Sequence, residues 1–340
     1  MKVAIVGGGV VGLTTAIIAQ NGSFRNANIT ILASDYDNIV SHVAAGIFRV
    51  GASFSSSNEE KVTKKWVENS YEFYDNIRKS DCASYAGVTD ISGYIFANSS
   101  PHTVQNHWLE SIVPVYRRAT EEEFQLVNGN WKYGSFFSTL LTQSTLYLPW
   151  IKQKLLANGV TFKQKELNSL KELTGEFDIV INCTGLGARK LCDDRRLVSI
   201  RGQVLKVKAP WIKTFFYGEL DTYIIPGFHG MVTLGGSRGF DSENMKLCPY
   251  ESAAIRERCE TLVPSVKDAE LLRQEVGLRP HREGGARIGE GNIVHSDCSN
   301  KTIIVHNYGH GGYGVCMAPG TAIATLDTVV DLHKVTYSKI

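Results

Sequence analysis

The sequence contains no long uninterrupted apolar run and no large excess of one charge. None of its apolar stretches approaches the roughly 20 residues that a membrane-spanning helix requires, so no membrane span is predicted. The 36 basic and 34 acidic side chains leave a net charge of +2, which gives no basis for binding nucleic acid or an anionic membrane surface. The apolar N-terminal stretch is interrupted by glycines and does not resemble a secretory signal.

Cysteine is also scarce, and its spacing excludes the common zinc motifs. The seven cysteines are scattered along the chain and form no C-x-x-C pair, so no metal site is predicted. An odd, scattered set of cysteines without an export signal is typical of reduced thiols, several of them buried. A chain of 340 residues, 43% of them hydrophobic, is long enough for two domains with sizeable cores.

The first twenty residues carry the pattern of a dinucleotide-binding turn. The short β-branched run Lys2–Val6 leads into Gly7, Gly9 and Gly12 in G-x-G-x-x-G spacing, and an apolar helical stretch follows. In such turns the first glycine permits the tight bend, the second lets a pyrophosphate approach the backbone, and the third lets helix and strand pack closely. The helix N-terminus presents N–H groups to the phosphates.

An acidic residue follows these glycines at the distance expected for ribose recognition. A second apolar run, Asn28–Ala33, ends at Ser34 and Asp35. In dinucleotide folds an acid about 20 residues past the glycines binds a ribose hydroxyl, which makes Asp35 the candidate. The alternative is that Asp35 only begins a surface turn.

Hydrophobic periodicity and turn residues predict the remaining elements. Helices are predicted over 58–79, 148–158 and 319–333, and strands over 91–97, 113–116, 160–163, 177–182, 203–208, 222–225, 231–234 and 303–305. The strand over 177–182 runs into the glycine turn Cys183–Gly187, where a nucleotide could lie against the backbone. The chain is therefore predicted to leave the nucleotide-binding domain and return to it twice.

Several further motifs accompany the opening glycine motif, namely Val43–Gly46, Asn182–Gly185, Arg201–Gln203, Tyr223–Gly227, Val276–Pro280 and Val305–Gly314. Together they make the sequence similar to the D-amino-acid oxidase and D-aspartate oxidase family, nearer the D-aspartate oxidases. The resemblance covers nearly the whole chain. It implies an α/β fold in which a Rossmann-like FAD-binding domain is interleaved with an antiparallel-sheet substrate domain. The expected ranges are 1–50, 146–190 and 288–340 for the first domain, and 51–145 and 191–287 for the second.

The resemblance also implies which residues bind the non-covalent FAD. They are Gly7, Gly9, Val10, Val11, Gly12, Ser34, Asp35, Ser41, Ala44, Ala45, Leu167, Thr184, Gly311, Gly312, Tyr313, Gly314, Val315 and Cys316. The family usually has an acid where Ser34 stands, and the following loop is one residue shorter here. The ribose contact therefore falls to Ser34 or to Asp35.

The reaction that the resemblance implies is oxidative deamination of a D-amino acid. Hydride leaves the substrate Cα for flavin N5, the imino acid hydrolyses to the 2-oxo acid and ammonia, and O₂ yields hydrogen peroxide. Arg279 is expected to bind the α-carboxylate, because a guanidinium matches a carboxylate with two parallel hydrogen bonds. Tyr223 is expected to donate its hydroxyl to the same carboxylate. No catalytic base is assigned, because none is required if the amine binds neutral.

The segment around Gly311–Gly314 carries a second set of expectations. The glycine turn stands between a strand and a helix, where it could stabilise negative charge on the reduced flavin, or could serve only the strand exit. His306 and His310 invite a proton-relay interpretation, but histidines in such a glycine turn are more often packing or hydrogen-bonding groups.

Two further arginines favour an acidic substrate. Arg238 resembles the arginine with which D-aspartate oxidases receive the side-chain carboxylate, and Arg49 follows the flavin-proximal turn. A neutral substrate would leave such charges unpaired in the pocket. Tyr217, which stands where aspartate oxidases often have another arginine, and Asn307 look more like the neutral-substrate branch. The alternatives are a neutral D-amino-acid oxidase, a glycine or sarcosine oxidase, a non-catalytic flavin-fold protein, and surface salt bridges for Arg49 and Arg238.

The last three residues, Ser338–Ile340, differ from the peroxisomal address S-K-L only in the final aliphatic residue. A peroxisomal location through the import receptor is therefore expected, and a cytoplasmic one if this tripeptide is only a frayed tail. Beyond the D-amino acid and O₂, the expected partners include neither nucleic acid nor membrane, and a homo-oligomer is left open.

Overall fold

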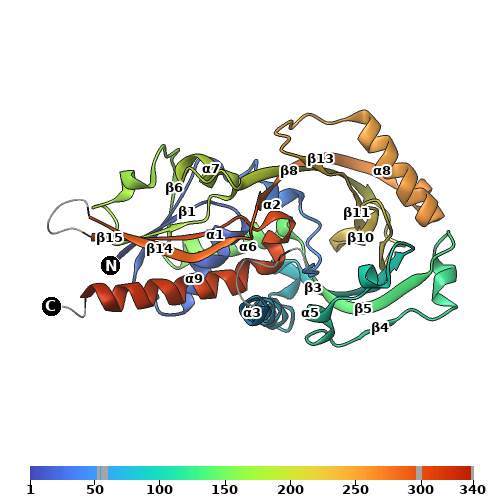
Figure 1. The fold of residues 1–340 in the computed structure, drawn as a ribbon, viewed down its shortest axis with the longest axis horizontal. Helices are drawn as coiled ribbons and strands as arrows, with labels where there is room; N and C mark the ends of the chain where they lie inside the picture. Colours follow the sequence, from blue (N-terminus) through green and yellow to red (C-terminus); the bar gives the residue numbers. More distant parts are fainter. Residues whose placement is uncertain (52–53, 55–59, 296–300, 338–340) are drawn as a thin grey trace.

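The computed structural model describes residues 1–51, 54, 60–295 and 301–337, and two sheets organise this part of the chain (Figure 1). One has six strands in the order β14-β15-β7-β1-β2-β6, and the other has nine strands. Ser338–Ile340 and Cys298 lie outside the described residues. The other six cysteines are free thiols, of which Cys183, Cys259 and Cys316 are buried.

The six-stranded sheet is parallel except at one edge. Strands β2, β6, β7 and β15 run parallel to their neighbours, and β14 pairs antiparallel with β15. Parallel strands are covered on both faces and therefore read as continuous apolar runs, as the fully buried β7 does. The strands are β1 (Lys2–Val6), β2 (Asn28–Ala33), β6 (Thr161–Gln164), β7 (Ile179–Asn182), β14 (Arg287–His295) and β15 (Lys301–Tyr308).

The nine-stranded sheet is antiparallel except for one pair, because β3 and β9 run parallel. Strands β8 and β13 pair along almost their whole lengths and occupy the middle of the molecule in Figure 1. The strands are β3 (Val88–Ala97), β4 (Tyr116–Arg118), β5 (Tyr133–Thr142), β8 (Leu197–Lys208), β9 (Phe215–Tyr217), β10 (Tyr223–Pro226), β11 (Met231–Gly235), β12 (Gly239–Phe240) and β13 (Glu270–Arg282).

Helices cover both sheets. In Figure 1 the long α9 runs along the six-stranded sheet, and α8 lies at the far side of the nine-stranded sheet, where it packs on β8 and β11. The helices are α1 (Val10–Asn21), α2 (Val40–Val43), α3 (Glu60–Arg78), α4 (Ala83–Ala86), α5 (His107–Glu110), α6 (Ser144–Ala157), α7 (Ala188–Leu191), α8 (Pro249–Leu262) and α9 (Gly314–Tyr337).

The helix predicted over 319–333 is α9, which begins at Gly314, five residues before Pro319. Pro319 cannot donate to the carbonyl oxygen of Val315, which would otherwise be its helical partner. The buried hydroxyl of Tyr74 donates to that oxygen instead, at 2.7 Å. A tertiary hydrogen bond therefore keeps the proline inside the helix.

Other predicted boundaries also shift. The strand over 113–116 is wrong, since β4 begins at Tyr116. The helix over 58–79 is α3, which begins at Glu60, and Asn58 lies outside the described residues. Helix α8 and strand β13 were not predicted, although the buried residues of α8, Ile255, Cys259 and Leu262, have helical spacing; the burial pattern of β13 does not alternate.

Helix α9 corrects the expectation that no apolar stretch is long enough to span a membrane. Within the described residues, Gly311–Lys334 passes that test by length and composition. Its apolar window is 61% buried inside the protein, and α9 packs on α1, α3, β14 and β15. Packing in the core therefore accounts for its apolar composition.

Candidate active site

A cavity of about 1320 Å³ connects the two sheets. It begins at the carboxyl ends of β1, β2 and β7, where parallel sheets bind nucleotides, and it ends against β10, β11 and β13. Pockets for a single small ligand are typically about 300–1000 Å³. This cavity has room for a dinucleotide and a small molecule beside it.

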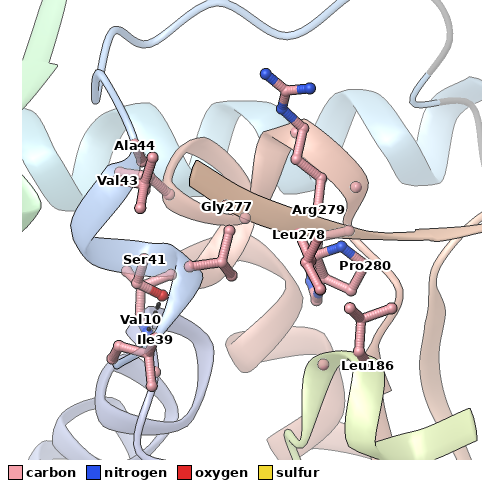
Figure 2. A pocket seen from close by; sticks show the side chains of 18 of the residues that line it. Val10, Ile39, Ser41, Val43, Ala44, Leu186, Gly277, Leu278, Arg279 and Pro280 are labelled. Atoms are coloured by element: carbon pink, nitrogen blue, oxygen red, sulfur yellow. Dashed lines mark hydrogen bonds between the residues drawn. The ribbon is translucent and has the colours of Figure 1, made fainter. Parts of the chain in front are cut away.

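The N-terminal glycines give the cavity its phosphate-binding end. Gly7 has a φ of +124°, and a Cβ on it would overlap the carbonyl of Cys183. A Cβ on Gly12 would overlap the carbonyl oxygen of Gly7, so this glycine sets the closeness of α1 to the strand. Gly9 caps α1 without a side chain, and the Val10 N–H donates to Ser41 Oγ at 3.1 Å (Figure 2).

Of the residues predicted to bind the cofactor, all except Gly12 line this cavity. Gly12 is buried behind the turn, where it acts through packing. The structure therefore brings together segments that are up to 300 residues apart in the sequence, which are Gly7–Val11, Ser34–Asp35, Ser41–Ala45, Leu167, Thr184 and Gly311–Cys316.

The Asp35 carboxylate both lines the cavity and caps its own turn. It accepts the N–H groups of Asp37 and Asn38 at 2.8 and 3.1 Å and the Asn38 side-chain amide at 3.0 Å. The hydrogen bond from the Asp37 backbone is the largest cause that holds its pKa below the usual value. Asp35 therefore stays ionised, and its Oδ1 already accepts two hydrogen bonds while its Oδ2 accepts one.

A second helix N-terminus faces the same cavity. The turn Gly311–Tyr313 is a single 3₁₀ turn, and α9 begins directly after it at Gly314. Gly314–Cys316, the first residues of α9, line the cavity. The positive ends of α1 and α9 therefore both favour negative charge in a ligand bound there.

His306 and His310 are both buried and both have hydrogen-bond partners within the protein, as expected of packing or hydrogen-bonding groups. His306 Nδ1 lies 3.2 Å from Asn182 Nδ2, and His310 Nε2 lies 3.0 Å from Thr321 Oγ1. Burial lowers the pKa of each imidazole to about 4. Both rings are therefore neutral at physiological pH.

Arg279 and Tyr223 come together at the other end of the cavity. Arg279 lies on β13, and its side chain extends away from the strand in Figure 2. Its Nη1 donates to the Ser237 carbonyl oxygen at 3.2 Å. Burial raises the pKa of Tyr223, and Arg279 opposes this increase. The Tyr223 hydroxyl thus remains protonated and able to donate to an anion.

Arg49 and Arg238 line the same cavity. The Arg49 guanidinium lies 4.9 Å from the ring centroid of Tyr217, and its Nε is buried without a hydrogen-bond partner among the residues that the structure describes. Arg238 Nη2 forms an ion pair with Asp221 Oδ1 at 2.8 Å, and the Arg238 side chain is 61% exposed. Each arginine therefore has hydrogen-bonding capacity left for an anionic ligand.

Comparison with known proteins identifies the family of this chain and the cofactor of that family. A protein-family model described as FAD dependent oxidoreductase matches residues 2–328. The chain belongs to the FAD-dependent oxidoreductase family. The cofactor of the family is FAD, and the predicted fold class is confirmed.

Individual members of the family give the same picture. Human D-aspartate oxidase is 34% identical over 95% of this chain and 92% of its own length. A D-amino acid oxidase from Dugesia ryukyuensis is 29% identical over 95% of both chains. Glycine oxidase from Geobacillus kaustophilus is only 17% identical, yet it superposes with a TM-score of 0.79 over 97% of this chain and 94% of its own. The resemblance to D-amino-acid and D-aspartate oxidases is confirmed.

The residues of the cavity fit FAD. The N-terminus of α1, where the Gly9 cap has no side chain, and the Gly7–Gly9 turn are suited to hold its pyrophosphate, and Ser34–Asp35 its ribose. The Val43–Ala45 turn, Thr184 and the start of α9 would surround its ring system. When bound, FAD would supply the hydride-accepting chemistry of an oxidoreductase.

A buried lysine, Lys206, supports the turn on which the flavin ring would lie. Its ammonium group donates to Thr233 Oγ1 at 3.0 Å and to the Val43 carbonyl oxygen at 3.3 Å, and Glu275 lies 3.8 Å away. Burial lowers the pKa of Lys206 to about 8. Sequence reasoning missed this residue, because a lysine in a strand gives no signal of its tertiary partners.

Sequence reasoning also missed two glycines that shape the substrate end. A Cβ on Gly202 would overlap the Arg279 guanidinium, and a Cβ on Gly235 would overlap the Tyr223 ring. These two positions therefore let the flat groups of Arg279 and Tyr223 lie directly against strand backbone. The Arg201–Gln203 motif contains Gly202, but its packing role depends on β13, which was not predicted.

Replacing Gly202 with alanine is expected to displace Arg279. The new methyl group cannot coexist with the guanidinium as it now lies, so KM for any carboxylate substrate rises about tenfold or more. Steady-state kinetics with D-aspartate and D-alanine measure this, and Gly239→Ala is the control, because its nearest neighbour atom is 3.5 Å away. Unchanged KM values with the Gly202 variant would contradict the packing role.

Proposed function

We propose that this chain oxidises acidic D-amino acids, D-aspartate and also D-glutamate, to the 2-oxo acid, ammonia and hydrogen peroxide. The observation that carries the proposal is the set of three arginines, Arg49, Arg238 and Arg279, that line one cavity together with Tyr223. A dicarboxylate is the amino-acid class that can engage more than one of these guanidinium groups. The 34% identity to human D-aspartate oxidase supports the same substrate class.

The protein groups contribute binding and orientation. Arg279 and the protonated Tyr223 hydroxyl bind the α-carboxylate, which fixes the direction in which the Cα–H bond points. Arg49 and Arg238 receive the side-chain carboxylate. No side chain is assigned as a base, because a neutral amine needs none.

Oxidation of neutral D-amino acids is the second candidate, and a specific observation favours it. Arg238 is already neutralised by Asp221, so a neutral substrate would face one less unpaired positive charge in the cavity. The identity to the D-amino acid oxidase of Dugesia ryukyuensis is consistent with this candidate as well.

Peroxide production with D-aspartate, D-glutamate, D-alanine and D-proline separates the two candidates. The proposal predicts that kcat/KM for D-aspartate exceeds that for D-alanine by at least about tenfold, the value of one well-placed charge interaction. Higher kcat/KM with D-alanine or D-proline would favour the neutral oxidase. No peroxide with any D-amino acid would contradict both.

A further inference from the structure

The Arg238 guanidinium already holds a carboxylate that belongs to the protein. Asp221 Oδ1 lies 2.8 Å from Arg238 Nη2, and both residues line the cavity that contains Arg279 and Tyr223. Asp221 also acts electrostatically on Tyr223, since its negative charge raises the pKa of that hydroxyl. The Asp221 carboxylate is thus at the substrate end of the cavity.

A tight turn holds Asp221 in this place. Leu220 and Asp221 have φ values of +55° and +59°, and the turn is closed by a hydrogen bond from Gly218 N to the Thr222 carbonyl oxygen at 2.9 Å. Glu219 anchors the turn from outside, because its carboxylate accepts the backbone N–H groups of residues 98 and 99 at 2.9 and 2.8 Å. The backbone therefore presents the Asp221 side chain to Arg238.

The other acidic residues that line the described cavity have different partners. Asp35 bonds its own turn, and the Asp37 and Glu166 positions belong to the same end of the cavity, near β2 and β6. Glu275 accepts from Arg273 at 2.7 Å. Within the described part of the cavity wall, Asp221 is the carboxylate that neutralises an arginine proposed to bind substrate.

We propose that, in the free enzyme, Asp221 binds Arg238 where the distal carboxylate of a diacid substrate would bind. Asp221 thereby determines how strongly the enzyme prefers diacids. This inference rests on the proposed function. A diacid displaces Asp221 from Arg238, whereas a neutral substrate leaves the pair intact and meets no uncompensated charge there. Asp221 therefore weakens diacid binding and keeps the cavity open to neutral D-amino acids.

The size of the effect follows from the exposure of the pair. Arg238 and Asp221 are 61% and 33% exposed, and ion pairs of this kind are weak because water competes for both charges. Their displacement therefore weakens diacid binding only about threefold to fivefold, the equilibrium factor of such a weak pair. Removing the Asp221 charge is expected to strengthen diacid binding by the same factor.

Asp221→Asn tests the inference, because asparagine keeps the volume and tolerates the left-handed backbone. Binding of succinate and butyrate to the purified holoenzyme, measured by the change in flavin absorbance, compares a diacid with a monoacid of equal length. The variant should bind succinate about threefold to fivefold more tightly, and butyrate no more tightly. In the Arg238→Ala background the same substitution should bring no gain.

Asp193→Asn is the matched control. Asp193 also has a positive φ, of +46°, and also faces an arginine, Arg195, at 3.6 Å, but this exposed pair is not part of the cavity wall. Asp193→Asn should leave the dissociation constants of succinate and butyrate unchanged.

Two failures are distinguishable. If the wild type prefers succinate to butyrate, and Arg238→Ala reduces that preference while Asp221→Asn leaves it unchanged, the role of Asp221 is refuted and the proposed function stands. If the wild type shows no preference for succinate and turns over D-aspartate no better than D-alanine, the proposed function and the inference are refuted together.

Discussion

Arg279→Ala is expected to lower kcat/KM by about 10²- to 10³-fold for D-aspartate and D-alanine alike. Truncating one partner of a hydrogen-bonded charge pair costs roughly 2–5 kcal/mol, because the other charge is left without its partner. Every amino-acid substrate carries the α-carboxylate that Arg279 is proposed to bind, so the side chain of the substrate should not matter. Steady-state kinetics with both substrates measure this loss.

Arg279→Lys is the informative companion variant. It keeps the positive charge but removes the planar fork that matches a carboxylate with two hydrogen bonds. It also removes the flat group that lies against Gly202. We expect it to recover part of the lost kcat/KM for both substrates. A loss confined to D-aspartate would show instead that Arg279 binds the side-chain carboxylate.

Arg49→Ala and Arg238→Ala are expected to act on diacids only. Each should raise KM for D-aspartate about tenfold, which corresponds to roughly 1.4 kcal/mol, and change KM for D-alanine little. We expect the larger effect from Arg49, because its Nε is buried and has no partner within the described part of the chain, whereas the Arg238 side chain is 61% exposed. The measurement is again steady-state kinetics with the two substrates.

Arg189→Ala is the control for these two variants. Arg189 forms similar exposed ion pairs, with Asp241 and Glu243 at 3.7 and 3.1 Å, but it does not line the cavity. It should leave both KM values unchanged. If Arg49→Ala and Arg238→Ala affected D-aspartate and D-alanine equally, the acidic preference would have to come from elsewhere.

The opening strand, glycine turn and helix of the nucleotide end were predictable because local sequence determines them, whereas the interleaved fold and the other cofactor contacts were implied by the family resemblance. The glycine motif needs only its spacing and the flanking apolar runs, and Gly7 and Gly12 have the steric roles that the motif implies. The predicted contacts at this end lie on strand-to-helix turns. Their position at the carboxyl ends of parallel strands follows from the topology alone.

The substrate end was less predictable because tertiary pairing determines it. Gly202 is required only because β13 places Arg279 against β8, and the Lys206 ammonium finds its partners across two other strands. The pair between Asp221 and Arg238 joins residues whose side chains meet only after β10 and β11 form a hairpin. Local patterns in the sequence do not predict these contacts.

The central claim is that a diacid D-amino acid binds among Arg49, Arg238 and Arg279 beside FAD. The most direct test is the absorbance spectrum of the purified protein before and after anaerobic addition of D-aspartate, with D-alanine in a parallel sample. We expect the visible flavin absorbance to be lost faster, and at lower concentration, with D-aspartate. A colourless protein, or flavin that D-alanine reduces as readily as D-aspartate, would contradict the account.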